Sequence, residues 1–224
     1  RTMAEEEDRS WKTGKVSGSY YCGDVEHYGY MTEAFGLFAH VNALQRDVCP
    51  SATRFEGEVI AMTLDMLGGD SITDSTPGGI LTSGGTGSIL HALLAYRDHA
   101  REQRGITQPN VVKPETGHPA FDKACHLFGI EMRRAPVNPE TATADVAGVA
   151  ELVDDNTIAI IGSACNYGYG TVDPIAELGQ VALAAGTGLH VDGCLGGFIL
   201  PWGRELGYDI EAFDFSVRGV TSMS

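Results

Sequence analysis

Hydrophobic and polar positions follow a helical period in the first third of the chain. Between about residues 26 and 43, apolar side chains recur every three or four positions, which predicts a helix. A second helix with the same spacing is predicted over residues 52–67, and the glycines at 68 and 69 are expected to end it. Residues 1–26 have no such period and contain many turn-forming residues, so we expect them to form an extended arm.

Beyond about residue 79, short apolar runs alternate with helical patterns. Strands are expected at residues 79–82, 110–114, 130–137, 157–162 and 188–192, and another is expected to begin within 213–217. Helices are expected between them at residues 88–104, 118–128, 144–153 and 173–185. Repeated strand–helix–strand units predict an α/β fold, in which a mainly parallel sheet carries helices on both faces. Ligands of such sheets bind at the carboxyl ends of the strands.

Composition narrows the classes of function. The 224 residues are 43% hydrophobic and 20% charged, which is the mix of a globular protein with a sizeable core. The formal net charge of −15 argues against nucleic acid as a partner and against docking on anionic lipid. A phosphorylated small molecule stays compatible with this charge, because a few N–H groups suffice to bind it. The sequence has no apolar run of about 18 residues, so we expect no membrane span.

The five cysteines are widely spaced, and no pair has the C-x-x-C pattern. Structural zinc and a disulfide framework are therefore not expected, and the residues indicate no metal site. Because disulfides persist in oxidising compartments and are rare in reducing ones, this use of cysteine indicates a cytoplasmic protein, and a membrane anchor ahead of Arg1 stays an open alternative.

A glycine-rich segment, Thr82–Ser88 with sequence TSGGTGS, joins an expected strand to an expected helix. Its glycines let a ligand approach the backbone closely, and the N-terminus of the following helix attracts an anion such as phosphate. The spacing fits neither a nucleotide-triphosphate loop nor a dinucleotide fingerprint. An ordinary glycine turn with a capping threonine explains the same residues, so the segment alone leaves both interpretations open.

Three other candidates follow expected strands. Asp192 ends a buried strand, where an unpaired carboxylate is costly and favours a cationic partner such as a protonated pyridine nitrogen. His118 opens a helix, where its ring could stack on a flat ligand. Tyr167 lies in a glycine-rich loop as a candidate proton donor or lid residue. Each has a structural alternative, namely a carboxylate accepting turn N–H groups, a capping histidine and a tyrosine that packs within its loop.

Five segments of the sequence together suggest a family. They are Thr82–Ser88 (TSGGTGS), His118–Ala124 (HPAFDKA), Val172–Pro174 (VDP), His190–Phe198 (HVDGCLGGF) and Phe213–Ser224 (FDFSVRGVTSMS). In this order they resemble the fold-type I pyridoxal-phosphate enzymes, in the group that contains the decarboxylases and the sphingosine-1-phosphate lyases. The resemblance implies pyridoxal 5′-phosphate as the cofactor, with its phosphate bound by Gly85 and Thr86. It also implies that His118 stacks on the cofactor ring and that Asp192 keeps the ring nitrogen protonated.

The N-terminal part is similar to the lyase branch of this group, through the segments GKVSGSYY at residues 14–21 and AHVNAL at residues 39–44. That likeness implies a retro-aldol cleavage of a phosphorylated long-chain base, of the sphingosine 1-phosphate type, into a long-chain aldehyde and phosphoethanolamine. It also implies a homodimer with shared active sites. Two alternatives stay open, an amino-acid decarboxylase of the tyrosine/aspartate type with the same cofactor, and an inactive fragment or assembly module.

The same resemblance assigns the substrate side of the site. Tyr21, Asn42 and Tyr167 are the candidates for substrate contact and proton transfer, and Tyr21 and Tyr167 join His118 and Asp192 as the expected catalytic residues. Gln45 would hold the substrate phosphate. It stands where the family usually has a histidine, and its amide can donate a hydrogen bond without carrying charge.

The family's Schiff-base lysine would lie beyond Ser224, and Arg1 is not an initiator methionine. We therefore expect the sequence to be incomplete as an enzyme, with further residues on both sides. On this view residues 1–50 form the N-terminal arm and first helix. Residues 51–224 form most of the large cofactor-binding α/β domain.

Overall fold

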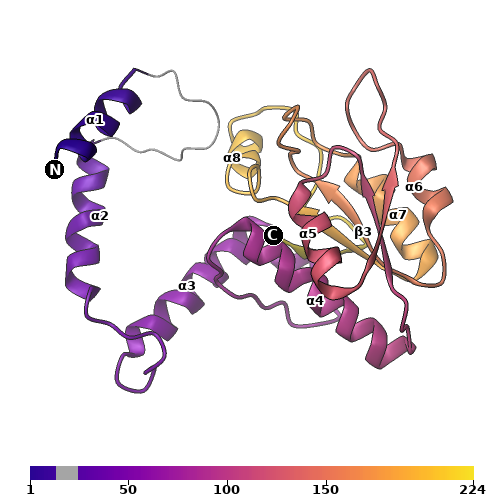
Figure 1. The fold of residues 1–224 in the computed structure, drawn as a ribbon, viewed down its shortest axis with the longest axis horizontal. Helices are drawn as coiled ribbons and strands as arrows, with labels where there is room; N and C mark the ends of the chain where they lie inside the picture. Colours follow the sequence, from indigo (N-terminus) through magenta and orange to yellow (C-terminus); the bar gives the residue numbers. More distant parts are fainter. Residues whose placement is uncertain (14–24) are drawn as a thin grey trace. The chain divides into compact units, whose positions relative to one another are not determined.

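The computed structural model describes residues 1–13 and 25–224 and divides into two compact units, residues 1–54 and 55–224 (Figure 1). The first unit contains α1 (Thr2–Trp11), α2 (Val25–Phe38) and the beginning of α3 (Pro50–Met66). The predicted helices near 26–43 and 52–67 are confirmed as α2 and α3. A glycine in the left-handed conformation, Gly68 with φ 72°, ends α3 and leads into a 3₁₀ turn, Gly69–Ser71.

The expectation of an extended arm over residues 1–26 is wrong for residues 2–11, which form α1. Two ion pairs with i,i+4 spacing, Arg1–Glu5 and Asp8–Lys12, lie along this helix. Such pairs stabilise a helix without any apolar period, so the pattern of hydrophobic positions could not reveal it.

The second unit is built on a five-stranded sheet in which every neighbouring pair is parallel. The strands are β1 (Asn110–Pro114), β2 (Glu131–Ala135), β3 (Thr157–Ser163), β4 (Gly188–Asp192) and β5 (Val220–Met223), in the spatial order β2-β1-β3-β4-β5. All seven residues of the central strand β3 are buried, as its continuous apolar run predicts for a strand covered on both faces.

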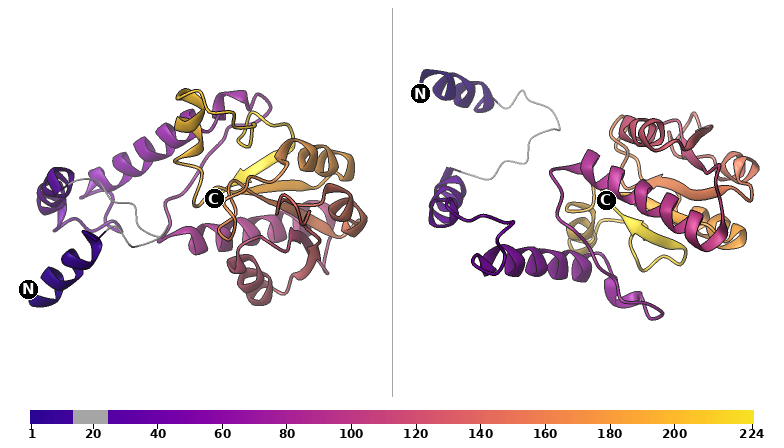
Figure 2. Two further views of the ribbon diagram at one scale, coloured as in Figure 1. Left: turned by 90° about the horizontal axis from the view of Figure 1, so that it is seen from above. Right: turned by 60° about the horizontal axis from the view of Figure 1, so that its bottom comes forward.

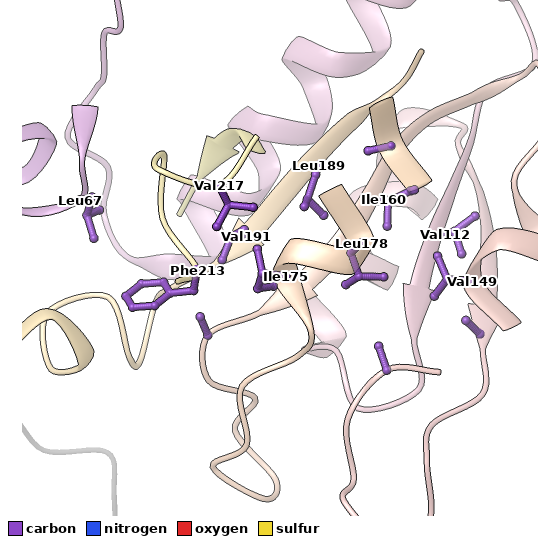
Figure 3. Close-up of a cluster of buried hydrophobic side chains, with 14 residues drawn as sticks. Leu67, Val112, Val149, Ile160, Ile175, Leu178, Leu189, Val191, Phe213 and Val217 are labelled. Atoms are coloured by element: carbon purple, nitrogen blue, oxygen red, sulfur yellow. The ribbon is translucent and has the colours of Figure 1, made fainter. Parts of the chain in front are cut away.

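Helices cover both faces of the sheet, which confirms the expected architecture. On one face lie α4 (Gly85–Arg104) and α5 (Pro119–Phe128), and on the other lie α6 (Val146–Leu152) and α7 (Ile175–Ala185). Figure 2 shows α4, in magenta, alongside the strands. Successive residues of β3 point to opposite faces, so Ile161 packs in the core beneath α4 and α5, while Ile160 packs in the core beneath α7. Figure 3 shows this second core, in which Ile160, Leu178 and Leu189 meet.

Two predicted strands are wrong. Residues 79–82 pair with no described strand, because the segment lies against α3, where the Leu81 N–H donates to Glu56 Oε1 at 3.3 Å. Residues 213–217 form a turn ahead of β5. The Asp214 carboxylate organises that turn by accepting hydrogen bonds from the N–H and the hydroxyl of Ser216 and from Arg204. The pattern of hydrophobic positions did not predict the short helix α8 (Leu200–Glu205).

Candidate active site

The carboxyl ends of parallel strands lie at one edge of the sheet, and the candidate residues gather there. His118 follows β1, Tyr167 follows β3 and Asp192 is the last residue of β4. In the sheet, β3 lies between β1 and β4, and Ser163 at the end of β3 is directly paired with Asp192. The sheet topology therefore brings these loops to the edge where α/β proteins bind ligands.

The glycine-rich segment forms the beginning of α4. The Thr82 hydroxyl bridges the turn through the Gly84 N–H and C=O and lies 2.7 Å from the Ser88 hydroxyl. Gly84, with φ 144°, is the N-cap residue and has no side chain to cap the helix. The N–H groups of Gly85 and the exposed Thr86, in the first turn of α4, have no intrahelical acceptor and are suited to bind an anion.

The glycine-rich segment packs against the turn that follows Asp192, and Gly85 lies at the contact. A Cβ atom at Gly85 would lie 2.7 Å from Cys194 Sγ, so the first turn of α4 packs directly on the turn that follows Asp192. A cavity of about 650 Å³ opens at this contact and is lined there by Gly84, Gly85, Ser88, Gly193, Cys194 and Ser224. Its remaining walls are mainly apolar and come from α3, α4, β5 and the segments at residues 78–81, 197–198 and 215.

Asp192 is 7% exposed, and one of its carboxylate oxygens accepts a hydrogen bond from the Cys194 N–H at 3.1 Å. Asp192 therefore accepts a turn N–H group, as the structural alternative predicted, and this bond involves one of its two carboxylate oxygens. Desolvation and the nearby Asp192 charge raise the pKa of Cys194 to about 12, so this thiol stays protonated at neutral pH and is a poor nucleophile.

His118 is exposed at the N-terminus of α5, and its Nδ1 accepts a hydrogen bond from the Ala120 N–H at 3.1 Å. The ring therefore caps the helix, and this bond orients its plane. A buried cation fixes the turn before it. Lys113, 3% exposed, donates to the Gly117 carbonyl at 2.9 Å and to Asp122 Oδ2 at 2.7 Å.

The other predicted site residues are not brought to this cluster by any described contact. Tyr167 is 65% exposed in a loop whose base is held by the buried Asn166, which bonds Thr171. Asn42 and Gln45 belong to the unit of residues 1–54, where the Gln45 N–H donates to the Asn42 carbonyl in a turn after α2. Tyr21 lies outside the described residues.

Two hydroxyl groups that the sequence did not single out lie at the same edge. Thr116 Oγ1 and Ser163 Oγ are buried and have no hydrogen-bond partner among the described residues. Ser163 pairs with Asp192 in register, and paired residues of parallel strands point to the same face. The sequence places Ser163 at the end of an expected strand, but neither its register beside Asp192 nor the lack of a partner for its hydroxyl is visible there.

These residues fit pyridoxal phosphate. The glycine turn and free helix N-terminus suit the phosphate, the buried carboxylate suits the protonated ring nitrogen, and the unpaired hydroxyls are available for polar groups of a ligand. No helix in the described part of the chain is both long and apolar enough to cross a membrane. Residues 1–13 and 25–224 contain no cluster of three or more metal-binding side chains.

Comparison with known proteins agrees with this fit. Residues 11–219 match the pyridoxal-dependent decarboxylase conserved domain, and the chain belongs to this family. The family is pyridoxal-dependent, so the expected cofactor is confirmed.

Within the family, the chain is similar to sphingosine-1-phosphate lyases, which confirms the resemblance seen in the sequence. It is 47% identical to the lyase of Arabidopsis thaliana over 97% of this chain and 40% of the plant protein. The solved structure of the Burkholderia pseudomallei lyase matches with a TM-score of 0.96 and 54% identity, over 100% of this chain and 52% of that one. A probable L-tyrosine/L-aspartate decarboxylase of Methanosarcina barkeri is 38% identical over 86% of this chain and 50% of its own length. The chain thus spans about half or less of the length of these relatives.

Gly85→Ala is expected to weaken pyridoxal phosphate binding about tenfold, because the new methyl group would lie 2.7 Å from Cys194 Sγ and displace the turn after Asp192. Gly87→Ala is the matched control, since a Cβ there meets its neighbours at 3.4 Å or more. Titration of the cofactor-free whole protein with pyridoxal phosphate gives both dissociation constants. Equal affinity in the two variants would show that the contact between α4 and the Asp192 turn does not shape the cofactor site.

Proposed function

We propose that the whole protein is a pyridoxal-phosphate-dependent carbon–carbon lyase. Its substrate would be a phosphorylated long-chain base of the sphingosine 1-phosphate type, and its products a long-chain aldehyde and phosphoethanolamine. The observation that carries this proposal is the likeness to the Burkholderia lyase, which extends over the entire chain, including the unit of residues 1–54. The contact between the glycine turn and the Asp192 turn supports it, because it brings a helix N-terminus suited to a phosphate close to a buried carboxylate.

When bound, pyridoxal phosphate supplies an electron sink for the pair left by the broken carbon–carbon bond. In this proposal Asp192 holds a proton on the ring nitrogen, because a carboxylate with little access to water favours an adjacent cation. The first-turn N–H groups at Gly85 and Thr86 hold the cofactor phosphate. His118, oriented by its bond to the Ala120 N–H, packs against the ring and limits its tilt.

The substrate side of the proposal rests on four residues. Tyr167 presents its phenol at an exposed loop tip beyond β3, from which it would transfer a proton to or from the substrate. Tyr21 and Asn42 would contact the substrate, and Gln45 would donate a hydrogen bond to the substrate phosphate. Because Gln45 is neutral, its contribution is that of a neutral hydrogen bond rather than a charge-assisted one.

Decarboxylation of tyrosine or aspartate is the second candidate, favoured by the likeness to the Methanosarcina protein. Product analysis separates the two. The whole protein with pyridoxal phosphate is incubated with sphingosine 1-phosphate and, separately, with tyrosine and aspartate, and the products are identified by mass spectrometry. A long-chain aldehyde with phosphoethanolamine supports the lyase. An amine with carbon dioxide from either amino acid, and no aldehyde, would replace it with the decarboxylase.

A homodimer in the cytoplasm completes the proposal. In residues 25–48, large apolar side chains lie exposed, among them Tyr30 (70%), Phe35 (74%) and Leu44 (90%), as expected of a surface that packs on a partner subunit. Cys49, Cys125 and Cys165 form no disulfide among the described residues, which suits a reducing compartment. Sedimentation analysis should find a dimer, and an active monomer would contradict a shared site.

A further inference from the structure

His190 lies two residues before Asp192 on β4, so both side chains point to the same face of the sheet. It is fully buried, and both ring nitrogens are hydrogen-bonded to β5 and the residue after it. Nδ1 lies 2.7 Å from Ser222 Oγ, and Nε2 lies 3.0 Å from Ser224 Oγ. Desolvation lowers the pKa of His190 to about 3, so the ring is neutral and does not act as a counter-ion for the Asp192 carboxylate.

Ser224 contacts residues on both sides of Asp192. Its N–H donates to the Val191 carbonyl at 3.1 Å, and its carbonyl accepts from the Gly193 N–H at 2.7 Å. Its hydroxyl bonds His190 Nε2 and accepts from the Cys194 thiol at 3.5 Å. One residue next to β5 therefore holds the backbone immediately before and after Asp192, together with the side chains two positions away on either side.

The His190 ring also contacts the helices α4 and α5 that cover this face of the sheet. The Tyr96 hydroxyl, from α4, lies 2.6 Å from both Ser222 Oγ and Thr221 Oγ1. The rings of Tyr96 and Phe121 approach His190 edge-on, with centroid distances of 6.4 and 5.7 Å. Because α4, α5 and β5 all contact the imidazole, it has little freedom to turn, and it can transmit this rigidity to Ser224.

We propose that His190 and Ser224 are positioning residues that fix the direction of the Asp192 carboxylate toward the cofactor ring nitrogen. The imidazole orients the Ser224 hydroxyl, and Ser224 holds the turn in which Asp192 lies. This inference rests on the proposed role of Asp192.

The test compares three single variants of the whole protein. Ser224→Ala removes the hydroxyl, Ser224→Thr keeps one, and Thr221→Ala removes a hydrogen bond to Tyr96 in the same network without touching His190. The readouts are the dissociation constant for pyridoxal phosphate, the absorption spectrum of the bound cofactor, which responds to protonation of its ring nitrogen, and the melting temperature. His190→Gln is measured in parallel. If this variant of a buried residue does not fold, the Ser224→Ala result decides the test.

We expect Ser224→Ala to weaken pyridoxal phosphate binding about fivefold and to alter the cofactor spectrum, with Ser224→Thr restoring both. Thr221→Ala should lower the melting temperature only. If Ser224→Ala and Thr221→Ala have the same affinity and the same spectrum, the hydroxyl has a purely structural role and the inference is wrong. Asp192→Ala distinguishes this failure from failure of the proposed site. If Asp192→Ala has the wild-type cofactor affinity and spectrum, Asp192 itself does not contact the ring nitrogen and the proposed site is wrong.

Discussion

Replacing Asp192 by alanine is expected to lower kcat of the whole protein by about 10³-fold, equivalent to about 4 kcal/mol of transition-state stabilisation. The reason is electrostatic. Asp192 is 7% exposed, and its carboxylate would stabilise the proton on the ring nitrogen, on which electron withdrawal from the substrate depends. Asp192→Asn should lose nearly as much, because it keeps the shape of the side chain and an oxygen for the Cys194 N–H but not the charge. Steady-state kinetics with saturating cofactor measures both effects.

Asp173 provides a matched control for burial of an acid at the same edge of the sheet. It is 1% exposed, and its two oxygens accept hydrogen bonds from the Ala144 and Ser163 N–H groups, each at 2.8 Å. Asp173→Asn should therefore lower the melting temperature while the surviving folded protein keeps most of its kcat. Wild-type activity in Asp192→Ala would refute the electrostatic role of this residue.

Lys113→Met is expected to lower the free energy of unfolding by about 2 to 3 kcal/mol, which is less than for a fully buried ion pair. Removing the ammonium group leaves the Gly117 carbonyl without its donor and Asp122 with Arg134 as its remaining cation. The turn before His118 loses its anchor, so pyridoxal phosphate affinity should also fall. Lys123→Met, at an exposed position of α5, is the control and should change the stability by less than about 0.5 kcal/mol.

The Lys113 effect should depend on pH in a defined direction. Burial raises the pKa of Asp122, but the hydrogen bond and charge of Lys113, with Arg134, lower it overall below its ordinary value of 3.8. A depressed carboxyl pKa contributes stability above the ordinary value, and that contribution is lost as the pH falls through the folded-state pKa. The stability gap between wild type and Lys113→Met should thus be full at pH 7 and narrow below pH 3.8. Urea unfolding at several pH values measures it, and a gap that widens in acid would exclude the ion pair as its source.

Much of the sheet could be predicted because its strands are short apolar runs with clear boundaries. β1 and β4 begin and end at the expected residues, and β3 extends one residue further, to Ser163. The beginning of α4 was less clear. It starts at Gly85 rather than Ser88, since the glycines of its first turn carry no apolar period.

The wrong strands have a common physical cause. An apolar run becomes a strand only if a neighbouring strand accepts its backbone hydrogen bonds, and a sequence does not name that neighbour. Residues 79–82 lie against α3 instead, and residues 213–217 are bent by the Asp214 carboxylate. Helix α1 is stabilised by charged pairs rather than by an apolar face, so its pattern resembled that of an arm.

The candidate site, like the sheet, could be predicted only in part from the sequence. The position of Asp192 at the end of a buried strand and the family resemblance of the glycine segment pointed to Asp192 and Gly85, and the structure brings their turns into contact. The interactions that hold the site were not visible in the sequence, because Lys113 and His190 bond residues that only folding places beside them. Tyr21, Asn42 and Gln45 came from a resemblance of the N-terminal part, and their roles stay predictions.

A crystal structure of the whole protein with pyridoxal phosphate bound would test the central claim most directly. We expect the cofactor phosphate at the N-terminus of α4, in contact with Gly85 and Thr86. The ring nitrogen should lie within hydrogen-bond distance of the Asp192 carboxylate, with the His118 imidazole against the ring. A cofactor bound away from this edge of the sheet, or a ring nitrogen that does not meet Asp192, would contradict the account.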